Sequence, residues 1–191
     1  MTEREAMTEF DYIIVGGGAA GCVVAARLAE DPGVTICLLE AGRSDEGDAS
    51  FSDYRNWTSL VGAADDFYYR VEPQAFGNDR IGISAGRILG GGSSHNTALA
   101  FHTPHYDLRQ WALLGADGWD SREVRALADA VFKRISGGEH EPRHPIAAAF
   151  VDAAMRCGYQ QQSLAHWDIG EGVGWLNITS RGGVRQSASV S

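Results

Sequence analysis

Three glycines between two apolar runs constrain the fold of this chain more than any other feature. Gly16, Gly18 and Gly21 have the spacing G-x-G-x-x-G. The apolar run 12–15 before them predicts a strand buried on both faces, and residues 23–29 after them predict a helix that ends at Asp31-Pro32-Gly33. A second apolar run, 34–39, predicts the next strand. The sequence therefore predicts a strand–turn–helix–strand unit with two parallel strands.

Each glycine of this turn has a separate role. Gly16 permits the tight turn, Gly18 lets the backbone approach a pyrophosphate, and Gly21 lets the helix pack closely on the strand. The helix N-terminus presents free N–H groups to phosphates, and Glu40, at the end of the second strand, can accept hydrogen bonds from ribose hydroxyls. We interpret the unit as a dinucleotide-binding turn rather than a structural one. By itself the motif does not separate FAD from NAD.

The rest of the chain predicts loops and two amphipathic helices. We expect a loop over 42–53, an extended segment over 67–71, a loop over 82–94, and strands and turns after residue 170. One helix is predicted over 122–135, with a capping box of Asp120 and Glu123 and a buried stripe of Val124, Leu127, Val131 and Ile135. Another is predicted from Pro145 to Cys157, stopped by Gly158, with a buried stripe of Ile146, Ala149, Phe150, Ala153 and Cys157.

Composition narrows the function classes. A net charge of −9 without a basic stripe argues against nucleic acid as a partner. We expect no membrane span, because no apolar run reaches about 18 residues, and no signal peptide, because the N-terminus is charged. Three cysteines without metal or disulfide spacing fit the cytoplasm. We predict no metal site and interpret the paired histidines as surface or loop residues: His102, His105, His140 and His144.

A second glycine cluster helps to distinguish FAD from NAD, which the first motif cannot do. Residues 86–96 read Gly-Arg-Ile-Leu-Gly-Gly-Gly-Ser-Ser-His-Asn, and a loop with so little side-chain bulk can lie flat against a planar ligand or its pyrophosphate. The segment resembles the first signature of the glucose-methanol-choline (GMC) oxidoreductase family, G-[RK]-x-L-G-G-x-S-x-x-N. Two further segments also resemble the family: Asp107…Trp111…Gly118-Trp119 and Glu40-Ala41-Gly42. The resemblance therefore extends from Phe10 to Ser191.

The resemblance implies the fold and the domains. It implies an α/β protein, with a Rossmann-like FAD-binding domain built on a parallel sheet over 1–143 and the beginning of an α+β substrate domain over 144–180. The chain would return to the FAD-binding domain over 181–191, where it resembles G-x-R-x-S-S-S. Family members are much longer, so the chain resembles a truncated member. The catalytic His and its His or Asn partner are expected in the missing C-terminal part, and no catalytic residue is assigned here.

The resemblance also implies the cofactor, FAD. His95 replaces the aliphatic residue usual before the signature Asn, which is similar to the choline oxidase group, where this histidine is bonded covalently to the 8α carbon of the flavin. The alternative is a buried histidine hydrogen-bonded to the backbone. Together the motifs and the resemblance assign these positions to the cofactor: Gly16, Gly18, Ala19, Ala20, Gly21, Glu40, Ala41, Arg87, Leu89, Gly90, Gly91, Ser94, His95, Asn96, Thr97 and Leu99.

The activity implied is FAD-dependent oxidation of a primary alcohol, choline-like or other, to an aldehyde by hydride transfer to flavin, with O2 or a quinone as acceptor. Trp57 matches a tryptophan in the lid over the substrate, although core packing explains it equally well and Thr58 replaces the methionine that follows it in that group. A C-terminal companion chain and a homo-oligomer are the expected partners. Two alternatives stay open: a non-catalytic FAD-binding fragment that needs a second chain, and a nicotinamide-binding protein.

Overall fold

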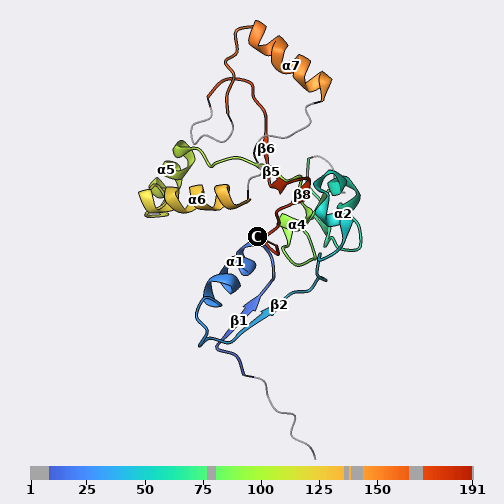
Figure 1. The fold of residues 1–191 in the computed structure, drawn as a ribbon, viewed down its shortest axis with the longest axis vertical. Coiled ribbons are helices and arrows are strands. Elements are labelled where there is room, and N and C mark those ends of the chain that lie inside the picture. The colour runs from blue at the N-terminus through green and yellow to red at the C-terminus, as the bar shows by residue number, and fades with distance from the viewer. Residues whose placement is uncertain (1–8, 77–80, 136–137, 139–143, 164–169, 191) are drawn as a thin grey trace, which may run out of the picture. The chain divides into compact units, whose positions relative to one another are not determined.

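The computed structural model describes residues 9–76, 81–135, 138, 144–163 and 170–190, and these form two compact units (Figure 1). The first unit extends to Asn96 and also contains Ser187–Val190, while the second extends from Thr97 to Gln186. The boundaries predicted at residues 143 and 180 separate a FAD-binding domain from a substrate domain, and they stay a prediction.

The predicted strand–turn–helix–strand unit is confirmed at the start of the first unit. β1 (Tyr12–Val15) pairs in parallel with β2 (Ile36–Leu39), and α1 (Ala19–Leu28) joins them and lies alongside the pair (Figure 1). The helix begins four residues before the predicted start, because the small residues after Gly18 are compatible with a helix. The predicted α/β class is therefore confirmed.

The expectation that these strands are buried on both faces is wrong for this chain. Ile13 is 63% exposed and Val15 is 83% exposed, and Leu39 of β2 is half-exposed. A parallel sheet needs helices on both faces to bury its side chains. Two strands with α1 beside them leave much of their apolar surface uncovered.

The remainder of the first unit consists of short elements. They are α2 (Ala49–Ser52), a 3-10 turn η1 (Tyr54–Asn56), α3 (Trp57–Leu60), the antiparallel pair β3 (Tyr69–Arg70) and β4 (Gly82–Ile83), and α4 (Gly92–His95). Phe51, Leu60 and Ile88 form its buried apolar cluster. The expectation of a plain loop over 42–53 is wrong in part, because the Asp48 carboxylate caps α2 by accepting from the Ser50 N–H. The loop expected over 82–94 likewise contains β4 and the start of α4.

The second unit contains the longer helices and two small antiparallel pairs. The helices are α5 (His105–Leu113), α6 (Arg122–Ile135) and α7 (Pro145–Arg156), and β5 (Leu99–Ala100) pairs with β6 (Asn177–Ile178), and β7 (Ser180–Arg181) with β8 (Val184–Arg185). The bounds predicted for α6 are confirmed. Its cap is a correction: Ser121 Oγ, rather than Asp120, accepts from the Val124 N–H at 3.2 Å. The Pro145 start of α7 is confirmed, and Gly158, with φ +97°, follows its end.

The stripes predicted to be buried on α6 and α7 are largely exposed, because few described elements pack against them. Leu127 and Val131 of α6 are 66% and 53% exposed, and Ile146 and Phe150 of α7 are 75% and 68% exposed. Val151 is the buried residue of α7. None of the described residues of α6 is buried.

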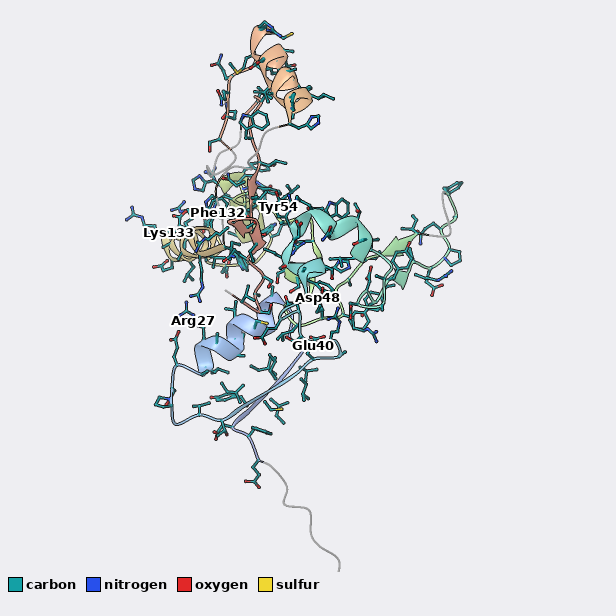
Figure 2. All side chains as sticks on the ribbon, turned by 45° about the vertical axis from the view of Figure 1, so that its right-hand side comes forward. Arg27, Glu40, Asp48, Tyr54, Phe132 and Lys133 are labelled. Carbon is teal, nitrogen blue, oxygen red and sulfur yellow. The ribbon has the colours of Figure 1, made fainter. Side chains whose placement is uncertain are left out.

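The paired histidines are expected at the surface or in loops, and His102 lies in a loop but is buried. His102 stacks on Phe132 of α6 (labelled in Figure 2), with ring centroids 4.2 Å apart. His105 begins α5, His144 is exposed and caps α7, and His140 lies outside the described residues. Within the described ranges, no three His, Cys, Asp or Glu side chains are grouped to hold a metal ion. No helix in the described part of the chain is long and apolar enough to cross a membrane.

Candidate cofactor site

The first glycine turn has the geometry that its spacing indicates. Gly16 has φ +97° and its N–H donates to the Leu39 carbonyl at 2.8 Å, so the turn closes onto the end of β2. A Cβ on Gly21 would lie 1.9 Å from the Gly16 carbonyl oxygen, a separation that no side chain tolerates. A Cβ on Gly18 would meet nothing within 4 Å. The turn is therefore closed toward the protein at Gly21 and open at Gly18, where α1 begins.

Glu40 fastens this turn to the chain that follows β2 (Figure 2). Its Oε2 accepts from the Gly17 N–H at 2.7 Å and its Oε1 accepts from the Gly42 N–H at 2.8 Å. An ionised carboxylate has about four lone-pair sites, so both oxygens retain the capacity to accept another hydrogen bond. The predicted ribose contact at Glu40 thus remains chemically possible beside this structural role, and Ala41 is exposed next to it.

The second glycine cluster lies directly against the first. The Gly90 N–H donates to the Gly17 carbonyl at 2.7 Å, and Gly18 and Gly90 form a parallel bridge. A Cβ on Gly91 would lie 2.8 Å from the Gly18 Cα. Gly90 and Gly91 are buried and have φ +87° and +54°, which favour glycine. The structure thus brings together two motifs that are about seventy residues apart in the sequence.

His95, at the end of α4, is enclosed by the first unit. It is 5% exposed, its Nε2 lies 3.0 Å from the Leu60 carbonyl oxygen, and its Nδ1 lies 3.4 Å from Ser84 Oγ. Asp66 Oδ2 lies 3.7 Å from Nε2. The contact with Leu60 agrees with a histidine hydrogen-bonded to the backbone, while the covalent bond to flavin stays a prediction.

The other positions assigned to the cofactor are divided between the units. Ser94 is fully buried, Leu89 is half-buried, and Asn96 and Arg87 are exposed, with Arg87 Nη2 donating to the Ala64 carbonyl at 2.7 Å. Ala19 and Ala20 form the exposed first turn of α1. Trp57, at the start of α3, is 37% exposed. Thr97 and Leu99 belong to the second unit, so their place beside the glycine motifs stays a prediction.

Sequence reasoning missed Asp45, which fixes the second glycine loop. Its carboxylate accepts from Ser94 Oγ at 2.9 Å, from Ser189 Oγ at 2.9 Å and from Ser187 Oγ at 3.3 Å. Ser93 Oγ also accepts from the Ala188 N–H at 2.9 Å. The last described residues of the chain therefore attach to the 90–94 loop. The serines near the end of the chain could be recognised in the sequence, but no pattern connects them with Asp45.

Sequence reasoning also missed Asp66, a fully buried carboxylate beside His95. Its oxygens accept from the backbone N–H groups of Gly62, Tyr68 and Ala85 at 2.7–2.9 Å and from Ser84 Oγ at 2.8 Å. Burial alone raises the pKa of Asp66, but these hydrogen bonds to the ionised form outweigh it and lower the pKa from 3.8 to about 2. Asp66 is therefore a fixed negative charge at neutral pH.

The β1–α1–β2 unit, with its glycine turn, defines an α/β protein with parallel strands. The sequence model of the GMC oxidoreductase family matches residues 10–191, so the chain belongs to this family. It is 36% identical to choline oxidase of Arthrobacter globiformis over 96% of its own length and 37% of that protein, and 32% identical to mitochondrial choline dehydrogenase of Mus musculus over 96% and 34%. Pyridoxine 4-oxidase from Mesorbium loti has a similar fold, with a TM-score of 0.80 at 27% identity over 95% of this chain and 39% of that one. The chain thus spans little more than a third of the length of these relatives.

Proposed function

We propose that this chain holds FAD in an enzyme that oxidises a primary alcohol to an aldehyde. The observation that carries the proposal is the contact between the two glycine motifs, in which the Gly90 N–H donates to the Gly17 carbonyl and Gly91 packs on Gly18. Membership of the GMC oxidoreductase family and the similarity to choline oxidase support FAD as the cofactor and a choline-like alcohol as the first substrate to test.

The residues present fit the adenosine diphosphate half of FAD. The backbone at Gly18 is open, and α1 begins there with no acidic residue in its first turn. The first N–H groups of a helix have no partner within the helix and carry partial positive charge, which suits a pyrophosphate. Glu40 retains oxygen lone pairs for the ribose hydroxyls. A Cβ on Gly92 would also meet nothing within 4 Å, so the second loop is open beside α4.

The roles proposed for this chain are binding and orientation. When bound, FAD supplies the hydride acceptor of the reaction. Gly16–Gly21 and Glu40–Ala41 would hold the pyrophosphate and ribose, Arg87–Asn96 would lie along the flavin, and His95 would attach it covalently. Thr97 and Leu99 would lie near the flavin, and Trp57 would lie over the substrate. The proposed functional domains are 1–143, 144–180 and 181–191.

The groups that move the hydroxyl proton are proposed to lie outside this chain. A catalytic His and its His or Asn partner would come from a C-terminal companion segment or chain, and a homo-oligomer and an O2 or quinone acceptor complete the proposal. The length of the relatives, of which this chain covers little more than a third, supports that arrangement. Three free cysteines among the described residues support a reducing, cytoplasmic setting.

Acid denaturation tests the proposal. The purified chain, with its companion if one is co-expressed, is denatured in acid, and flavin fluorescence is measured in the polypeptide and in the supernatant. Flavin retained on the chain, and released in the variant His95→Ala, is the expected result. Flavin released from both proteins would contradict the covalent bond but not FAD binding. No flavin in either fraction would contradict FAD binding by this chain, and a bound nicotinamide in its place would favour the alternative of a nicotinamide-binding protein.

A further inference from the structure

The two groups that contact the His95 ring are both connected to the carboxylate of Asp66. Ser84 Oγ, which faces His95 Nδ1 at 3.4 Å, donates to Asp66 Oδ2 at 2.8 Å. Leu60, whose carbonyl oxygen faces Nε2 at 3.0 Å, comes two residues before Gly62, whose N–H donates to the same Oδ2 at 2.7 Å. Asp66 therefore restrains the group on each side of the imidazole ring.

The surrounding backbone shows how firmly Asp66 is itself held. Its Oδ1 accepts from the N–H groups of Tyr68 at 2.9 Å and Ala85 at 2.8 Å. Tyr68 has φ +44°, a conformation rarely adopted by a residue with a bulky side chain, and such strain persists where the surroundings determine it. The four hydrogen bonds fill the lone-pair sites of the carboxylate. Asp66 thus acts as a rigid hub that connects the 60–68 turn with the 84–85 segment.

The single hydroxyl proton of Ser84 determines how this residue contacts the His95 ring. A serine hydroxyl carries one proton, and the shorter, charge-assisted contact with Asp66 takes it. Ser84 Oγ then presents a lone pair to Nδ1, as the Leu60 carbonyl does to Nε2, and a neutral imidazole donates its single N–H to one of these two oxygens. A ring rotated by half a turn about its Cβ–Cγ bond would place carbon atoms opposite both oxygens. The two oxygens therefore select one orientation of the imidazole.

We propose that Asp66 is the positioning residue of His95: through Ser84 and the Leu60–Gly62 turn it fixes the orientation of the ring that is to meet the flavin. The consequence for flavin attachment rests on the proposed function. The consequence for the ring itself does not, because it concerns contacts within this chain.

The test measures the ring and the attachment separately. The full chain is labelled with 15N-histidine, and the ring signals of His95 are assigned by their loss in His95→Gln. Ser84→Ala removes the contact with Nδ1 and leaves the backbone bonds of Asp66 in place, and Asp66→Asn disrupts the hub. We expect both variants to shift or broaden the His95 ring signals. Where flavin is supplied, attachment joins one ring nitrogen to the 8α carbon, with loss of the N–H and C–H protons and transfer of the electron pair to the flavin. We expect this step to be about tenfold slower in both variants, as followed by the mass of the His95 peptide.

Two control variants separate positioning from folding. Ser84→Thr keeps the hydroxyl and should restore the ring signals. Ser59→Ala removes a hydroxyl that donates to the Asn56 carbonyl at 2.7 Å, one residue from Leu60, and should change nothing at His95. Unchanged ring signals in folded Ser84→Ala would overturn the proposal, even if Asp66→Asn fails to fold. Altered ring signals in a chain that takes up no flavin would support the positioning role and contradict the proposed function alone.

Discussion

Glu40→Gln is the substitution that most sharply tests how the first glycine turn is held. The carboxylate accepts from two backbone N–H groups, Gly17 at 2.7 Å and Gly42 at 2.8 Å. A glutamine keeps the shape of the side chain and one acceptor oxygen, but its –NH2 group would face the other N–H donor. The variant therefore loses one charge-assisted hydrogen bond and leaves one amide of the turn without an acceptor.

The magnitude follows from that loss. A hydrogen bond to a charged group contributes about 1.5–3 kcal/mol, and the half-buried position of Glu40 favours the lower end. With a urea dependence of about 1–3 kcal/mol per molar, a loss of about 1.5 kcal/mol lowers the unfolding midpoint by roughly 0.5–1.5 M. The assay is urea unfolding followed by far-ultraviolet circular dichroism.

The matched control is Glu30→Gln, which removes the same charge after α1. Glu30 pairs with Arg27 at 2.6 Å, and both side chains are about two-thirds exposed, so we expect a change below about 0.5 kcal/mol. If Glu40→Gln lowers the midpoint no more than Glu30→Gln, Glu40 does not fasten the turn and the reasoning is refuted.

Three further results are expected. Gly21→Ala should destabilise the chain by about 3 kcal/mol in urea unfolding, because its Cβ would lie 1.9 Å from the Gly16 carbonyl oxygen, while Gly92→Ala, which meets nothing within 4 Å, should not. Asp45→Ala should make residues 187–190 easier to cleave with a protease, because Ser94 and Ser189 lose the carboxylate that accepts from both. Equal cleavage rates in the variant and the unaltered chain would contradict this attachment. Hydrogen bonds hold the pKa of Asp66 at about 2 against its burial, below the unfolded value near 3.8. The contribution of Asp66 to the free energy of unfolding should therefore be complete above pH 4 and be lost as the pH falls from about 4 to 2. If the stability of Asp66→Asn falls equally steeply over this pH range, the prediction is contradicted.

Local patterns predicted the elements that depend on local sequence. The runs before and after the first glycine turn predicted β1 and β2, and the apolar spacing of residues 122–135 predicted α6 to the residue. The cap of α6 was assigned to Asp120 although Ser121 forms it, because two capping residues stand side by side and the pattern does not choose between them. The resemblance to the family predicted the second glycine motif as part of the same site.

Burial and long-range hydrogen bonds were not predictable in the same way. Ile13, Phe150 and Val15 lie in patterns typical of buried residues, but burial depends on which elements cover them, and they are exposed here. Asp45 bonds to a serine 144 residues away, and Asp66 to one 18 residues away, so no sequence window contains either network. Asp45 lies in the loop expected over 42–53 and Asp66 just before the extended segment expected over 67–71, and no local pattern distinguished either carboxylate.

The measurement that tests the central claim most directly is an equilibrium titration of the chain with FAD, followed by quenching of flavin fluorescence. The comparison is between Gly91→Ala, whose Cβ would lie 2.8 Å from the Gly18 Cα, and Gly115→Ala, which has φ +104°, carries the same kind of backbone strain and meets nothing within 4 Å. We expect the unaltered chain and Gly115→Ala to bind FAD alike, and Gly91→Ala to bind at least about tenfold more weakly, a change of about 1.4 kcal/mol. Equal binding by Gly91→Ala, or no binding by the unaltered chain, would contradict the claim that the two glycine motifs form one FAD-binding surface.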